Sequence, residues 1–396
     1  QRIKTYYYSA VGERWSVPFG INELTDEQVS HRTFSYKMEY QGGVLKRLSH
    51  VNSVGTLTKD ENRENDALWE YQYTEQGKIQ SVTVKSETTK KVQKINFQFS
   101  DKNQAIVLLN NPPTSIFVQE FNREEKSDIS QHLLTYSSDG YVLKREYQNP
   151  YGTPSPMDNK HYGVAYAPNE NGLDKSSFLL DKNGGEFGDS QSEYRYNSFS
   201  QIVKEKTSRN GKVSNTIWSY DKWGNVITKD KSESIGDKKT HFEVDINGNV
   251  LKEYVTDLSG SYLNQRVAIK KFTYDKSGRI AEEVFFDVKE QPTYGAEKCE
   301  KVSHEYDDNG NVIIRICYDS KENLNLNYEG CAITKLKRNE YGDIESELCL
   351  DQSEKLAVMN YVQAAQIKNT YDAFGYRSSQ SYYGVDGMPV VNVNGY

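Results

Sequence analysis

The stretch FTYDKSGRI at residues 272–280 decides the fold, because the chain writes it several times. HEYDDNGNV stands at 304–312 and WSYDKWGNV at 218–226. Each copy has an aromatic residue, an Asp, two turn residues and a Gly, followed by an apolar alternation. A pattern that recurs at intervals of this length is typical of a structural module in a repeat protein.

The repeat is most regular in the second half of the chain. Successive turn glycines lie 24 to 33 residues apart, and they are Gly224, Gly248, Gly278, Gly310, Gly342 and Gly375. Three residues before them stand Asp221, Asp245, Asp275, Asp307, Asn339 and Asp372. One residue earlier the copies carry Tyr220, Val244, Tyr274, Tyr306, Arg338 and Tyr371.

Each repeated position has a physical reason in a β-hairpin. An Asp at the start of a tight turn accepts backbone N–H bonds from within the turn. The Gly supplies a positive φ, as in a three-residue hairpin loop with a bulge. Asn103 can replace Gly because Asn tolerates that conformation, whereas Ser200 at the same position predicts an altered turn. The alternation after the Gly predicts strands with one buried face.

The copies predict an all-β chain of tandem antiparallel hairpins that form an elongated or curled, solenoid-like sheet. Thirty Tyr and 27 Gly, against 9 Pro and 4 Met, agree with strands and turns. We expect degenerate repeats over 1–148, an irregular insertion or junction at 149–195, and regular repeats of 24–33 residues over 196–396. A short helix at 354–368, where Ala and Gln are dense, is an open alternative.

The units YDKWGNVITKD, YDKSGRIAEEVFFD and YDDNGNVIIRICYD resemble the YD repeats of bacterial RHS proteins, cell-wall-associated repeat proteins and teneurin ectodomains. The resemblance covers most of the chain and is strongest from Tyr196 onward. It implies a β-hairpin repeat protein of the bacterial surface or a secreted one. Two features depart from RHS shells: the repeats reach 33 residues, and no RHS core, self-cleavage signature or toxin is present.

The four cysteines occupy two positions of the repeat. Cys331 and Cys349 follow Cys299 and Cys317 by 32 residues each. Cys299 and Cys317 fall opposite each other around the turn at Gly310, so cross-hairpin disulfides Cys299–Cys317 and Cys331–Cys349 are geometrically reasonable. A Cys317–Cys331 bridge and four reduced thiols remain as alternatives. Any disulfide would indicate an extracytoplasmic location: the cell surface, the periplasm or a secreted protein.

Several function classes find no support in the sequence. The net charge of −7 gives no basic footprint for nucleic acid. No apolar run approaches the ~20 residues that span a bilayer. Phosphate-binding loops, nucleophile elbows and metal-ligand pairs are all missing, and the twelfth positions after Asp245 and Asp307 are Thr256 and Tyr318 rather than the Glu of a calcium loop. We therefore expect no metal, no cofactor and no enzymatic activity.

Trp218, Tyr220 and Trp223 form the candidate binding residues, because aromatic faces on rigid strands suit sugars and protein partners. Packing within the sheet is the alternative role. The sequence thus predicts a non-catalytic extracytoplasmic scaffold that binds a protein or glycan and assembles through an open sheet edge near VVNVNGY. The alternatives are a fragment of an RHS-like shell around a toxin and an enzyme, which a polar pocket with convergent carboxylates would favour.

Overall fold

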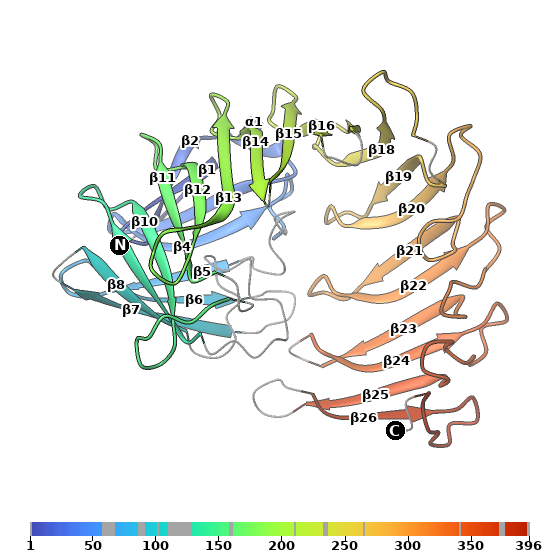
Figure 1. Cartoon of the computed structure of the whole chain (residues 1–396). Coiled ribbons are helices and arrows are strands. Elements are labelled where there is room, and N and C mark those ends of the chain that lie inside the picture. Colours follow the sequence, from blue (N-terminus) through green and yellow to red (C-terminus); the bar gives the residue numbers. More distant parts are fainter. Residues whose placement is uncertain are drawn as a thin grey trace. The chain divides into compact units, whose positions relative to one another are not determined.

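The computed structural model is all-β, which confirms the predicted fold class (Figure 1). It describes residues 2–57, 68–85, 92–100, 103–109, 129–157, 161–209, 211–232, 237–263, 266–339, 342–371 and 377–393. These residues form 26 strands and one helix, α1 (Asp26–Ser30). The predicted turn residues Asp372 and Gly375 lie outside the described residues.

The chain divides into two compact units. Unit 1 comprises Gln1–Glu87, Val92–Lys239 and Ile246–Gly248, and unit 2 comprises Thr88–Lys91, Thr240–Asp245 and Asn249–Tyr396. The sequence predicts an irregular insertion or a junction at 149–195. In the structure this stretch contributes β11 (Gly163–Pro168), β12 (Asp174–Leu180) and most of β13 (Glu186–Tyr196), which pair with one another as regular antiparallel neighbours.

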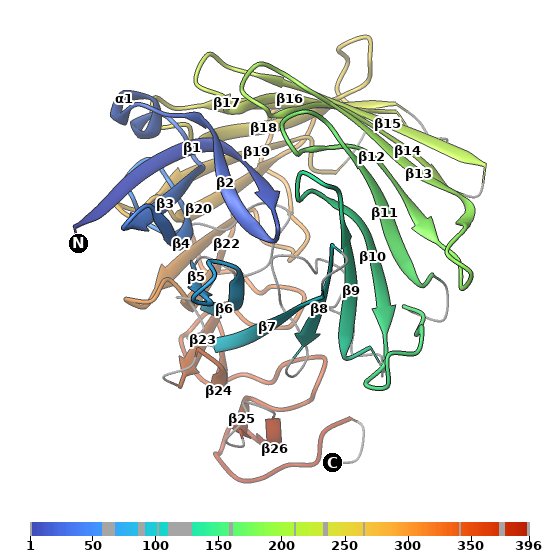
Figure 2. The ribbon, with the colours of Figure 1, turned by 90° about the vertical axis from the view of Figure 1, so that its left-hand side faces the viewer.

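Unit 1 is a run of antiparallel strands in which each hairpin pairs with the next (Figure 2). The pairing order is β2, β1, β3 and then β4 to β16 in sequence. The remaining strands are β1 (Ile3–Arg14), β2 (Val17–Glu23), β3 (Ser35–Gln41), β4 (Val44–Val51), β5 (Leu68–Tyr73), β6 (Ile79–Lys85), β7 (Val92–Ser100), β8 (Gln104–Leu109), β9 (Gln131–Tyr136), β10 (Val142–Gln148), β14 (Ile202–Arg209), β15 (Lys212–Tyr220) and β16 (Val226–Ser232).

The core of unit 1 lies on one face of β3 to β9. Met38, Trp69 and Val82 are fully buried there, and Leu134 is 2% exposed. Burying a side chain of this size contributes about 1.5–3 kcal/mol. The degenerate first repeats therefore supply most of the apolar core of this unit.

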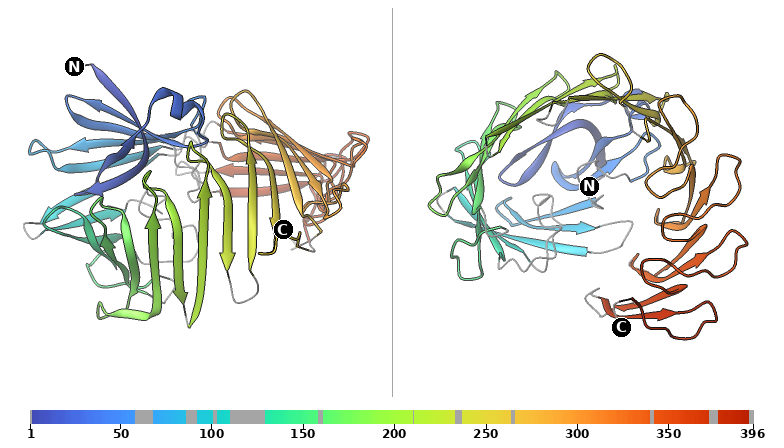
Figure 3. Two further views of the ribbon diagram at one scale, coloured as in Figure 1. Left: turned by 90° about the horizontal axis from the view of Figure 1, so that it is seen from above. Right: turned by 45° about the vertical axis from the view of Figure 1, so that its right-hand side comes forward.

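Unit 2 repeats a longer hairpin, whose orange to red ribbons follow one another in Figure 3. Its strands are β18 (Val250–Thr256), β19 (Ile269–Tyr274), β20 (Ile280–Phe286), β21 (Lys301–Tyr306), β22 (Val312–Tyr318), β23 (Ile333–Arg338), β24 (Ile344–Leu350), β25 (Gln366–Tyr371) and β26 (Arg377–Tyr383), and β17 (Lys238–Val244) crosses the division. After each hairpin a second turn closes on a single bridge, as Tyr318 does with Leu324. Each long repeat therefore holds one tight hairpin and a second, looser β excursion.

The helix considered at 354–368 does not form. The chain there makes the bridges Leu350–Leu356 and Met359–Ala364 and then enters β25. Met359, Ala364 and Ala365 are fully buried. Tertiary burial of these side chains in a β excursion outweighs the helix propensity of the segment.

The turns have the geometry that the repeat predicts. Oδ1 of Asp221 accepts the N–H groups of Trp223 (2.8 Å) and Asn225 (2.9 Å), and Gly224 has φ +92°. The same two bonds recur at Asp275 and Asp307. Ser200, expected to alter its turn, instead takes φ +59° and keeps the turn bond to Asn197 at 3.0 Å.

From Tyr196 onward, the tyrosine of the repeat has a role that the sequence did not reveal. Its hydroxyl donates to a main-chain carbonyl of the preceding hairpin, two residues after that hairpin's turn glycine or, in one copy, after Ser200 at the glycine position. The bonds join Tyr196 to Asp174 (2.7 Å), Tyr220 to Ile202 (2.6 Å), Tyr274 to Val250 (2.9 Å), Tyr306 to Ile280 (2.7 Å) and Tyr371 to Ile344 (2.9 Å). Where Arg338 replaces the tyrosine, its Nε donates to the equivalent carbonyl of Val312 at 3.1 Å. We call this bond the rung.

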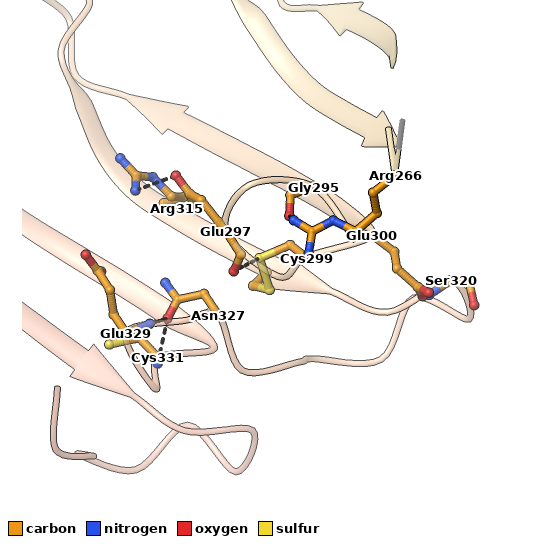
Figure 4. Close-up of a disulfide and its surroundings, with 11 residues drawn as sticks. Arg266, Gly295, Glu297, Cys299, Glu300, Arg315, Ser320, Asn327, Glu329 and Cys331 are labelled. Carbon is orange, nitrogen blue, oxygen red and sulfur yellow. Dashed lines mark hydrogen bonds and ion pairs between the residues drawn. A yellow bond between two sulfur atoms is a disulfide. The ribbon is translucent and has the colours of Figure 1, made fainter. Parts of the chain in front are cut away.

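The structure joins Cys299 to Cys317 and Cys331 to Cys349, the cross-hairpin arrangement that the sequence favours. Beside the first bridge, Arg315 forms an ion pair with Glu297 at 3.1 Å (Figure 4). In the preceding copy, Val267 and Phe285 stand 32 residues earlier and pack against the same cluster. The disulfides thus occupy a core position that the preceding repeat fills with the apolar pair Val267 and Phe285.

Candidate functional site

A cavity of about 770 Å³ lies in unit 1 against one face of β10 to β14. This volume falls within the range of ~300–1,000 Å³ that is usual for small-ligand sites. Residues 11–13 of β1 line it as well. The cavity is therefore bounded by repeats from the middle of the unit and by its first strand.

Strand register brings the lining residues to one face. Ser192 of β13 lies opposite both Ser177 of β12 and Thr207 of β14, and Tyr194 lies opposite Glu205. Directly opposite residues of antiparallel strands point to the same side of the sheet. Because successive side chains of a strand point to opposite faces, every second side chain of these strands points toward the cavity.

The first hairpin is held in place by the turns of later repeats. The N–H of Trp15 donates to the carbonyl of Gly140 at 2.7 Å, and Arg14 donates to the hydroxyl of Tyr141 at 2.6 Å. Further along β1, the hydroxyl of Ser9 donates to the carbonyl of Phe199 at 2.8 Å. These bonds position β1 over the ends of hairpins that follow it by more than a hundred residues.

Gly12 permits the close approach of β1. A Cβ at this position would lie 2.9 Å from the carbonyl oxygen of Asn171 and 2.5 Å from the ring of Phe19. Any side chain here would push the strand away from the cavity. Gly12 does not lie in a turn, and this site therefore needs glycine because it has no room for a side chain.

The cavity carries charges of both signs. Its charged lining residues are Glu13, Arg145, Asp174, Glu205 and Arg209. The guanidinium of Arg145 lies 5.7 Å from the ring centre of Tyr166. Burial raises the pKa of Asp174 to about 6, although Arg145 opposes the shift. Burial also raises the pKa of Tyr194 and of Tyr196, so that both remain neutral hydroxyl donors near pH 7.

Asp174 breaks the pattern of the repeat. It stands two residues after the turn glycine Gly172, where most other copies place an apolar residue and the copy at Gly375 places Arg377. The apolar residues include Leu45, Ile79, Val142, Ile202, Val226, Val250, Ile280, Val312 and Ile344. The carboxylate is thus specific to this copy and is not a general feature of the hairpin. The departure is visible in the sequence when the copies are aligned on their turns.

The predicted aromatic residues are separated by the structure. Trp218 and Tyr220 lie two and four residues after Thr216, which lies opposite Glu205. They therefore share the face of the sheet that bounds the cavity, but they do not line the cavity itself. Tyr220 forms a rung, and Lys229 lies 5.7 Å from the ring centre of Trp218. Trp223 stacks on His31 at 4.4 Å, beside α1. Each of the three side chains thus has a packing or hydrogen-bond contact within unit 1, and their role in binding stays a prediction.

Two further hollows are present. One of about 420 Å³ in unit 2 is lined by both apolar and charged residues, including Phe285, Glu283 and His304, and the other, of about 630 Å³, lies beside Trp15 and Phe99 in unit 1. The described residues contain no group of three or more His, Cys, Asp or Glu arranged to hold a metal ion. Within the same residues, no helix has the length and apolar character needed to cross a membrane.

Comparison with known proteins gives only distant likenesses. No protein-family model and no curated protein matches the chain. Among solved structures, a TcdB2-TccC3 complex is 12% identical over 91% of this chain and 24% of its own, with a TM-score of 0.16. The Tc holotoxin pore of Photorhabdus luminescens is 12% identical over 91% and 23%, with a TM-score of 0.17.

A porin-like protein from Bacteroides uniformis is 10% identical over 72% of this chain and 92% of its own, with a TM-score of 0.24. The chain spans about a quarter of the length of the toxin chains that it matches. Identities and TM-scores this low do not establish a shared function.

Proposed function

We propose that the chain is a non-catalytic extracytoplasmic scaffold that binds a glycan or protein partner through the copy-specific residues of unit 1. One observation carries the proposal. The repeated residues form turns and rungs, and although Gly172 and Tyr196 also line the cavity on β10 to β14, its charged lining residues differ from copy to copy. Recognition by variable residues on a repeated framework is typical of repeat proteins.

The location follows from the cysteines. Two disulfides lie within the hairpins of unit 2, and Cys299 and Cys349 are fully buried. Disulfides persist in oxidising compartments and are rare in the cytosol. The cell surface, the periplasm or the exterior is therefore the proposed location, and assembly through the sheet edge at β26 belongs to the same proposal.

The binding proposal is tested with the purified chain on a biosensor against a panel of bacterial surface glycans and extracellular proteins. Arg145→Ala and Glu205→Ala alter the cavity, and Glu193→Ala is the matched control. Glu193 lies on β13 next to Tyr194 but on the opposite face, where it pairs with Lys206 at 3.5 Å. We expect at least one ligand whose affinity falls with the cavity variants and not with the control. Equal losses in all three variants, or no ligand at all, would overturn the proposal.

A specific observation also favours a second candidate, an acid–base enzyme. Glu13, Asp174 and Glu205 share the cavity, and the pKa of Asp174 is raised to about 6 by burial. Pairs of carboxyl groups with different pKa values serve as acid and base in glycoside hydrolysis. Release of reducing ends from polysaccharides, measured with the wild type and with Asp174→Asn, would distinguish this candidate from binding alone.

A further inference from the structure

The polar lining of the cavity in unit 1 has a distinctive composition. Besides the five charged residues it presents the hydroxyl-bearing side chains of Ser177, Ser192 and Thr207. Tyrosines also line it: Tyr166, Tyr194 and Tyr196 are partly exposed and can offer ring faces to a ligand, whereas Tyr141 and Tyr147 are buried. This combination offers flat apolar faces together with many donors and acceptors and no single dominant charge. A uniformly charged ligand would meet like charges in such a site.

The main chain of the cavity wall is already engaged. β10 to β14 each pair with a neighbour on both sides, from β9 to β15. An extended peptide binds a sheet by adding a strand at a free edge, and these strands offer none. Recognition in this cavity is therefore confined to side chains, which disfavours a peptide strand as its occupant.

The position of Asp174 gives the site a directed acceptor. Its main-chain carbonyl accepts the rung from Tyr196 at 2.7 Å, so the residue is held at the strand start. Its side chain is half-buried and lines the cavity. Ligand hydroxyl groups are the natural donors for a partly desolvated carboxylate.

We propose that the cavity binds a short neutral oligosaccharide, whose hydroxyl groups donate to Asp174 and whose ring faces pack on the cavity tyrosines. This inference rests on the proposed function and names the ligand class of the same site. The volume of about 770 Å³ suits a small ligand and not the footprint of a protein partner.

The inference gives binding a pH dependence with a defined sign. Hydroxyl donors favour the ionised carboxylate, so affinity falls when Asp174 is protonated. Its pKa of about 6 in the free protein places this loss between pH 7 and pH 5. At pH 5 about one molecule in ten is ionised, which lowers the affinity roughly tenfold. The other ionisable groups facing this site are Glu13, Tyr141, Arg145, Tyr147, Tyr166, Tyr194, Tyr196, Glu205 and Arg209.

The test uses the full chain and titration calorimetry with neutral gluco-, manno-, xylo- and chito-oligosaccharides. We expect one series to bind the wild type at pH 7.5 and to bind roughly tenfold more weakly at pH 5. Asp174→Asn should lower the affinity at pH 7.5 by tenfold or more and remove the pH dependence. Glu170→Gln is the matched control, because Glu170 is an exposed acid in the turn of the same hairpin.

The outcomes separate this inference from the proposed function. An oligosaccharide that binds Asp174→Asn as well as the wild type would overturn the inference. Binding of a protein partner but of no oligosaccharide would overturn it while leaving the scaffold function intact. Absence of any ligand would overturn both. If Asp174→Asn does not fold, Thr207→Val removes a hydroxyl from the same wall and provides the second measurement.

Discussion

The hydroxyl of Tyr196 donates a hydrogen bond of 2.7 Å to the main-chain carbonyl of Asp174. The two residues belong to successive hairpins, and the same relationship recurs from Tyr220 to Tyr371. The aromatic residue of the repeat is therefore both a packing element and a connection to the copy before it. In the copy at residues 244–248, Val244 carries no hydroxyl to donate.

Removing a rung should destabilise unit 2 by a modest, measurable amount. Tyr306→Phe keeps the ring, which lies 4.6 Å from the Arg279 guanidinium, but loses the 2.7 Å bond to Ile280. We expect a loss of about 1 kcal/mol in the free energy of unfolding, measured by urea denaturation. Tyr151→Phe is the control, because Tyr151 is 91% exposed. Equal stability of Tyr306→Phe and the wild type would show that the rung contributes nothing.

The second turns of unit 2 contain a strained residue that glycine should relieve. Glu354 has φ +59°, whereas the equivalent turn after Asp257 has Gly260 at φ +90°. Glu354→Gly should raise the free energy of unfolding by roughly 0.5–1 kcal/mol, since a left-handed conformation costs a side chain about 1–2 kcal/mol and the flexibility of glycine returns part of it.

The reverse exchange is the control for this prediction. No atom would lie within 4 Å of a Cβ at Gly260, so Gly260→Ala tests the backbone alone and should destabilise the unit by about 1 kcal/mol. Thermal unfolding monitored by circular dichroism measures both variants. Effects of the same sign in the two variants would contradict the argument from backbone strain.

The disulfides should stabilise unit 2, and each should join two cysteines of the same hairpin. Each closes a loop with a sequence separation of 18 residues, for which about 3 kcal/mol is expected. Cys299→Ala with Cys317→Ala should lose this stability in guanidinium titrations. Cys299→Val with Cys317→Phe, the pair found as Val267 and Phe285, should recover part of it.

A mass map of peptides under non-reducing conditions checks the connectivity. It should contain the Cys299–Cys317 and Cys331–Cys349 cross-links as separate species. A cross-link between Cys317 and Cys331, or four free thiols in protein isolated from its native compartment, would remove the argument for the pairing and for the location.

Asp174 should make the stability of unit 1 depend on pH. The pKa of this carboxyl is about 6 in the folded chain and 3.8 in the unfolded chain, so the folded state binds the proton more tightly. The contribution of this carboxyl to stability is therefore fully present below pH 4, and it is lost as pH rises through 6, by up to roughly 3 kcal/mol. Asp174→Asn should match the wild type near pH 3.5 and exceed it above pH 7.

Urea denaturation at a series of pH values measures this difference. Asp139→Asn is the control, because Asp139 is an exposed acid in the turn before β10. A constant difference between Asp174→Asn and the wild type across the pH range would contradict a raised pKa for Asp174.

Some features of the repeat could be predicted from the sequence, and others could not. The turns at Asp221, Asp275 and Asp307 could be predicted because Asx and glycine chemistry acts within five residues. The helix at 354–368 could not be excluded, since only the burial of Met359 and Ala364 identifies that segment as part of a β excursion. The contact of Trp223 with His31 could not be predicted either, because it joins segments of unit 1 that are far apart in the sequence.

The sequence by itself determined the hairpins, their register around each turn and the positions of the cysteines, because these depend on local backbone preferences and on the period of the repeat. Only the tertiary structure decided that β1 lies across the turns at Gly140 and Phe199, and that Asp174 lines a cavity with Arg145 and Glu205. Such contacts join segments more than a hundred residues apart, or they depend on which side chains of neighbouring strands share a face of the sheet. They arise from side-chain packing over the whole unit, which no single copy of the repeat encodes.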